Sequence, residues 1–128
     1  MKKASTLFLF FASLLLLSSC RDTPEKLVED YQSLYEEACE VLDALHKGEI
    51  SITEAEEELV DFKSDFQKLL DRRAELEDDG KLVEGSEEYE VIIESLMPIH
   101  GKFMNLIMIL EGEGKMSPTL KKSLGYDL

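Results

Sequence analysis

Apolar residues recur at every third or fourth position along three long segments of this chain. This spacing places them on one face of an α-helix, so the pattern predicts three amphipathic helices. The main alternative, residues 103–110 as a strand, would leave a single strand without a partner. The three apolar stripes are Leu27, Tyr31, Leu34, Ala38, Val41 and Leu45; Ala55, Leu59, Phe62, Phe66, Leu69, Arg73 and Leu76; and Tyr89, Ile93, Leu96, His100, Phe103, Ile107 and Leu110.

Capping residues indicate where the first two helices begin and end. Thr23 can cap a helix that has Pro24 at its first position, and Gly48 is typical of a C-terminal stop, which predicts a helix over residues 24–47. A capping box at Ser51 or Thr53 then starts the second helix, which runs to about residue 78. The short connection between them predicts an antiparallel hairpin.

The third segment, residues 86–112, contains a proline in its interior. Pro98 removes one backbone hydrogen bond, which predicts either a kink or a break near residues 95–97. A short helical turn should follow between Ser117 and Leu124. Together these elements predict an all-α fold, namely an up-down-up three-helix bundle with a short C-terminal helical turn.

The first twenty residues have the pattern of a secretory signal. Lys2 and Lys3 precede a mostly apolar segment at residues 7–17, which is too short to cross a membrane as a retained helix. The ending Leu17-Ser-Ser-Cys20 resembles the lipobox of bacterial lipoproteins. That resemblance implies diacylation of the Cys20 sulfur with palmitate or similar chains, cleavage before Cys20 and, usually, acylation of the new amino group.

The resemblance also implies a location and a division of the chain. In enterobacteria an Asp after the lipidated Cys favours retention in the inner membrane, whereas Arg21 stands there in this sequence. We therefore expect a lipid-anchored protein of the bacterial cell envelope, on the outer membrane where the cell has one. Residues 1–19 form the signal peptide, residues 20–23 a lipidated tether and residues 24–128 an acidic helical-bundle domain.

The balance of charges is strongly acidic. Loss of residues 1–19 would remove Lys2 and Lys3 and no acid, which moves the formal net charge from −14 to −16. Nucleic acid is excluded as an expected partner because its recognition needs clustered Lys and Arg. The membrane is expected as a partner only through the anchor on Cys20. Like-charge neighbours such as Glu25 with Glu29 are slightly destabilising and are compatible with a basic protein partner.

Residues that could perform chemistry are scarce. His46 and His100 are the two histidines, and no phosphate-binding loop, zinc motif or nucleophile elbow occurs. Acids alternate along residues 75–79 as in a calcium-binding EF-hand loop, but Ser86 occupies the twelfth position where a Glu is required. We expect no enzyme activity, no cofactor and no metal site.

Cys39 would be the remaining thiol once Cys20 is acylated. It is either buried or joined to a second copy of the chain, and burial is the commoner outcome for a lone thiol.

A methionine-rich patch is the one candidate binding surface. Met97, Phe103, Met104, Ile107 and Met108 either pack in the core or line a groove for a partner helix or an acyl chain. The leading interpretation is a lipid-anchored, non-catalytic protein that acts by protein–protein binding in an adaptor, assembly or surface role. The alternatives are a carrier of a lipid or other hydrophobic ligand, and a structural protein that self-associates as a homodimer.

Overall fold

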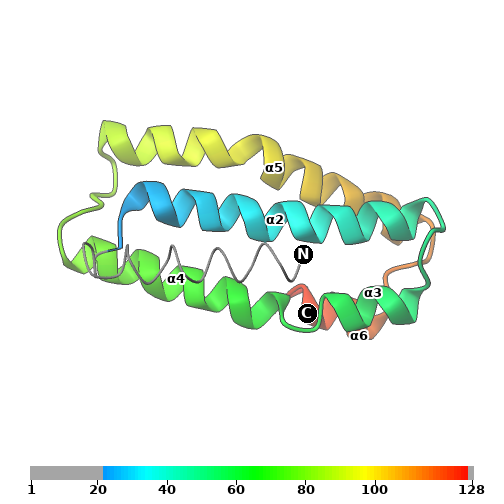
Figure 1. Ribbon diagram of the computed structural model, residues 1–128. Coiled ribbons are helices and arrows are strands. Elements are labelled where there is room, and N and C mark those ends of the chain that lie inside the picture. The colour runs from blue at the N-terminus through cyan, green and yellow to red at the C-terminus, as the bar shows by residue number, and fades with distance from the viewer. Residues whose placement is uncertain (1–21, 127–128) are drawn as a thin grey trace, which may run out of the picture.

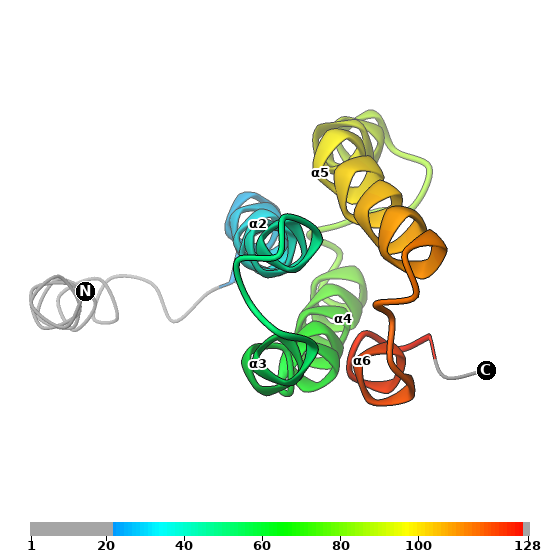
Figure 2. The ribbon, with the colours of Figure 1, turned by 90° about the vertical axis from the view of Figure 1, so that its right-hand side faces the viewer.

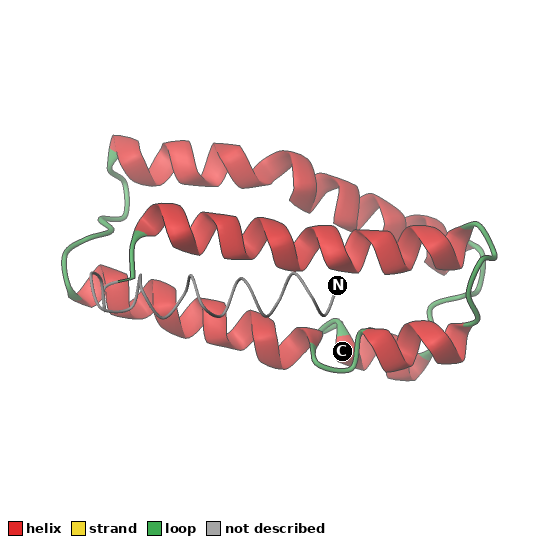
Figure 3. Ribbon diagram, in the orientation of Figure 1, coloured by secondary structure: helices red, strands yellow, loops and turns green. Residues whose placement is uncertain are grey.

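The computed structural model describes residues 22–126, and the regular structure of this part of the chain is helical throughout (Figure 3). The prediction of an all-α chain is therefore confirmed. The predicted signal peptide and Cys20 lie outside the described residues. The helices are α2 Pro24–His46, α3 Ile52–Glu58, α4 Phe62–Asp78, α5 Glu87–Gly112 and α6 Pro118–Ser123.

Helix α2 lies at the centre of the arrangement. It packs against α5 along one side and against α3 and α4 along another (Figure 1). Because it has neighbours on two sides, its buried face is wider than the predicted stripe. Tyr35, Cys39 and Leu42 are buried, whereas Leu34 and Val41 of the predicted stripe are only half-buried.

The second predicted helix is interrupted, which corrects the expectation of one continuous helix. Ser51 caps α3 by accepting a hydrogen bond from the backbone N–H of Glu54 at 3.1 Å, as one of the two capping boxes predicted. The helix then stops at Leu59, and a turn closed by the N–H of Phe62 donating to the Leu59 carbonyl leads into α4. Leu59 and Phe62 are both buried, so the break changes the helix direction without losing either core contact.

Helix α5 runs through Pro98 without a break, and it bends between its two halves (Figure 1). Two hydrogen bonds lie in the turn before the proline. The Ser95 hydroxyl donates to the carbonyl of Ile92 at 2.7 Å, and the Gln32 amide of α2 donates to the carbonyl of Ser95 at 3.4 Å. Of the two predicted outcomes, the proline thus gives a kink rather than a break.

Helix α6 is the predicted C-terminal turn. Ser117 caps it by accepting from the N–H of Leu120 at 3.1 Å, and Ser117 also donates to the Glu56 carboxylate of α3 at 2.6 Å. Leu120 and Leu124 are buried, and the Tyr126 hydroxyl donates to the sulfur of Met104 at 2.8 Å. In the end-on view, α6 occupies the fourth corner of a square whose other corners are α2, α3 and α5 (Figure 2).

Candidate binding groove

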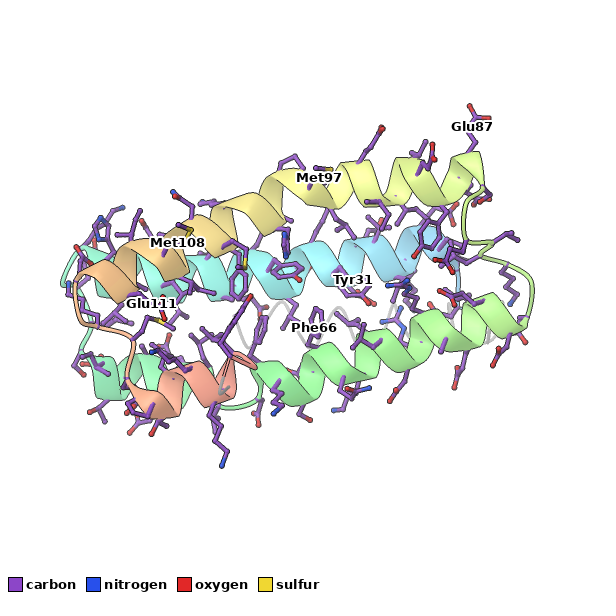
Figure 4. All side chains as sticks on the ribbon, turned by 180° about the vertical axis from the view of Figure 1, so that it is seen from behind. Tyr31, Phe66, Glu87, Met97, Met108 and Glu111 are labelled. Atoms are coloured by element: carbon purple, nitrogen blue, oxygen red, sulfur yellow. The ribbon has the colours of Figure 1, made fainter. Side chains whose placement is uncertain are left out.

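An apolar groove opens between α4 and α5, with α2 as its floor. It has a volume of about 340 Å³ and is open to solvent along one side. The groove lies in the half of the molecule that holds the start of α2 and the end of α4 (Figure 4). Its lining residues are Pro24, Leu27, Val28, Tyr31, Tyr35, Phe66, Leu70, Arg73, Leu82, Tyr89, Ile92, Ile93, Leu96, Met97 and His100.

The groove exists because α4 and α5 both pack on α2 and are not packed closely against each other. In the other half of the molecule α6 lies against α3, and its Lys121 pairs with Glu111 of α5 at 3.4 Å. In the half that holds the groove no described helix lies between α4 and α5, and Figure 4 shows the side chains of Tyr31 and Phe66 between these two helices. The bundle therefore has a fourth helix position. Helix α6 fills one half of this position, and the groove is the other half.

Aromatic side chains form the floor of the groove. The rings of Tyr31 and Tyr35 meet Phe66 edge to face, with centroids 5.9 and 6.1 Å apart. Tyr35 also meets the ring of His100 edge to face at 5.7 Å and that of Phe103 at 5.1 Å. Burial raises the pKa of the Tyr35 hydroxyl to about 12, so this ring stays neutral at physiological pH.

The wall on α5 is apolar and exposed. The side chains of Ile93 and Met97 are 43% and 63% exposed, and both line the groove. The predicted third stripe therefore splits into two parts. Its second half, including Phe103 and Ile107, is buried in the core, while its first half lines an open surface.

One cation lies at the end of the groove nearest the start of α2. The guanidinium carbon of Arg73 lies 5.5 Å from the centre of the Tyr89 ring, and the guanidinium donates to the Tyr89 hydroxyl. Its Nε also donates to the carboxylate of Glu77 at 3.0 Å. Because Glu77 balances this charge, the groove offers a visiting anion little net attraction.

The structure divides the predicted methionine-rich patch among three environments. Met97 lines the groove. Phe103 and Ile107 are buried core residues, and Met104 is half-buried beneath Tyr126. Met108 is 68% exposed on α5 and does not line the groove.

The sequence pattern did not predict that residues of α2 and α4 line the groove. Tyr31 and Phe66 were assigned to the core stripes, and Leu70 was not considered. One signal in the sequence could have indicated the groove. Three apolar helix faces meet at one end of the fold, and the segment after α4 is a polar loop that cannot cover them.

The remaining chemistry-bearing residues are arranged as follows. Cys39 is buried, which is the commoner of its two predicted outcomes. His46 Nδ1 lies 2.9 Å from the Glu113 carboxylate, joining the end of α2 to the end of α5. In residues 22–126 no three His, Cys, Asp or Glu side chains are grouped so that they could hold a metal ion.

By length and composition, α5 is long and apolar enough to cross a membrane. It is the one helix in the described part of the chain that meets this criterion. Here it packs along α2, with Leu106 and Leu110 buried. Its apolar composition therefore serves two surfaces of the folded chain, the core in its second half and the groove in its first.

Comparison with protein-family models, with curated proteins and with solved structures finds no match to this chain.

Proposed function

We propose that this chain is a lipid-anchored, non-catalytic protein of the bacterial cell envelope that acts by binding another protein. The observation that carries the proposal is the apolar groove between α4 and α5, because a folded domain rarely leaves such a surface uncovered without a use for it. The scaffold would be an up-down-up bundle of α2, the α3–α4 pair and α5. Among the described residues, α6 lies beside one end of this bundle, where it packs on α3.

The anchor part of the proposal rests on Cys20 and the short tether. Asp22 contacts Arg72 of α4, so a lipid on Cys20 would lie close to the folded domain. The open groove would then face the region next to the membrane, because Pro24 and Leu27 line its nearest end. A protein held there would meet partners that are also at the membrane surface.

Labelling with an alkyne analogue of palmitate tests the anchor. The full-length chain should incorporate the label, and Cys20→Ala should abolish both the label and the cleavage of residues 1–19. Cys39→Ala is the matched control and should leave both unchanged. Equal labelling of the Cys20→Ala variant would refute the anchor.

A second candidate function is a carrier for a lipid or another hydrophobic ligand. It is favoured by the volume of the groove, which is within the range of small-molecule sites. Light scattering, native mass spectrometry of the delipidated protein and a pull-down separate the candidates. A monomer that retains a co-purified lipid supports the carrier, recovery of another protein in the pull-down supports protein binding, and an empty dimer without another partner supports the self-associating alternative.

A further inference from the structure

The groove continues the position that α6 occupies. A second hollow, lined by Leu124 and Tyr126 after α6, shares Tyr35, Phe66 and His100 with the groove. The apolar floor therefore extends beyond the segment that carries α6. It continues along α2 toward Pro24.

The length of this uncovered floor suits a short helix. The groove follows α2 from Pro24 to Tyr35, which at 1.5 Å per residue is about 16 Å, or roughly three helical turns. Its sides are the helices α4 and α5, and its surface is made of aliphatic and aromatic side chains, with one thioether at Met97. An amphipathic helix binds in this kind of groove through apolar residues spaced by three and four positions.

The rim of the groove along α5 and the loop before it is acidic. Glu84 of the loop and Glu90 and Glu94 of α5 line a hollow that shares Tyr89 and Ile93 with the groove. All three carboxylates are on exposed residues. A helix lying in the groove would therefore bring its flanking polar residues next to carboxylates.

Resting on the proposed protein-binding function, we propose that the occupant is a basic amphipathic helix of about three turns from a different protein. It would lie end to end with α6 and complete the fourth position of the bundle. Its apolar residues would cover Tyr31, Phe66 and Met97, and its Lys or Arg residues would pair with Glu90 and Glu94.

Charge argues against the other two occupants. A second copy would bring its own acidic rim to this one, at a formal net charge of −14 for each full chain. An anionic lipid headgroup or a fatty-acid carboxylate would meet the same acids, and the nearby Arg73 is already bonded to Glu77.

Site-directed photocrosslinking in intact cells that make the full-length chain tests this inference. The probe is p-benzoylphenylalanine in place of Met97, with the same probe at Met108 and at Val60 as matched controls. These three residues are 63%, 68% and 63% exposed, and only Met97 lines the groove. The readout is the identity and sequence of the molecule crosslinked at each position.

The expected result is a protein adduct at Met97 that is at least fivefold stronger than at either control. The crosslinked segment should carry a net positive charge and apolar residues spaced by three and four. Glu90→Lys combined with Glu94→Lys should reduce this adduct at least fivefold. Resistance of Cys39 to alkylation confirms that each variant is folded.

Each other result overturns the inference. An adduct with a second copy, with a neutral or acidic protein segment, or of equal strength at all three positions refutes the basic helix while leaving protein binding intact. A lipid adduct at Met97 refutes both the helix and the proposed protein-binding function. Absence of any adduct at Met97 in the folded chain refutes the groove as a docking site.

Discussion

The guanidinium of Arg72 holds the carboxylate of Asp22 through two hydrogen bonds. Nε lies 2.7 Å from Oδ2 and Nη2 lies 2.8 Å from Oδ1, while Nη1 donates to the carboxylate of Asp30 at 2.6 Å. The pair joins residues fifty positions apart and fixes the first described residue against α4. Such two-point geometry restricts direction as well as distance, so it orients the start of the chain on the domain.

Asp22→Asn should lower the free energy of unfolding at pH 7 by about 1 kcal/mol, because it replaces a paired carboxylate by a neutral amide. The Arg72 guanidinium lowers the pKa of Asp22 below its usual 3.8. A lowered folded-state pKa gives stability that is complete above the unfolded value and is lost as the pH falls through the folded value. The difference between the two proteins should therefore shrink below about pH 3.8.

Urea unfolding curves at pH 7 and at pH 3 measure this difference. Asp61→Asn is the control because the Asp61 side chain makes no capping hydrogen bond, and it should change stability by less than about 0.5 kcal/mol. A difference for Asp22→Asn that is the same at both pH values would show that the carboxylate charge is unimportant.

Local sequence signals were sufficient for most helix boundaries. Thr23, Ser51, Ser86 and Ser117 all cap helices through their side chains. They were predictable because capping depends on residues within one turn. The break at residues 59–61 was not predictable in this way, since Leu59 and Phe62 fit the same apolar stripe whether or not the helix is continuous.

The groove could be predicted only in part, for a different physical reason. Periodicity shows which face of a helix is apolar, but it does not show whether another element covers that face. Phe103 and Ile93 lie on the same predicted stripe, yet one is buried and the other is 43% exposed. Phe103 packs against the rings of Tyr35 and Phe62, whereas Ile93 lines the open groove, so the difference comes from tertiary packing.

Pro98→Ala should raise the free energy of unfolding by about 1 to 3 kcal/mol. Alanine restores an N–H that can donate to the carbonyl four residues earlier, and residue 98 is exposed, so no core contact is lost. The bend of α5 should decrease at the same time. Thermal unfolding followed by circular dichroism measures the stability.

Pro118→Ala is the matched control for this substitution. Pro118 lies in the first turn of α6, where a proline replaces no hydrogen-bonded N–H, so its removal should not stabilise the protein. If Pro98→Ala instead lowers the unfolding temperature, the bend itself contributes packing that outweighs the missing hydrogen bond.

Cys39 should react with iodoacetamide at least about a hundredfold more slowly in the native protein than in urea. The side chain is 1% exposed, and burial raises the pKa of the thiol, so both access and thiolate formation require opening of the fold. Ser33→Cys places a thiol at an exposed position of α2 and should react rapidly in the native protein. Equal rates at the two positions would contradict the packing of α2.

Leu120→Ala should destabilise the protein by about 2 to 4 kcal/mol, because this fully buried side chain anchors α6 between α3 and α5. Thr119→Ala, at the exposed neighbouring position, should cost less than about 0.5 kcal/mol. Hydrogen exchange measures the local effect, and protection should fall first in residues 117–124. The loss of α6 would also expose the half of the fourth helix position that α6 now fills. If protection instead falls equally across α2 and α6, then α6 unfolds together with the core. A partner helix in the groove would then have to bind while α6 stays in place.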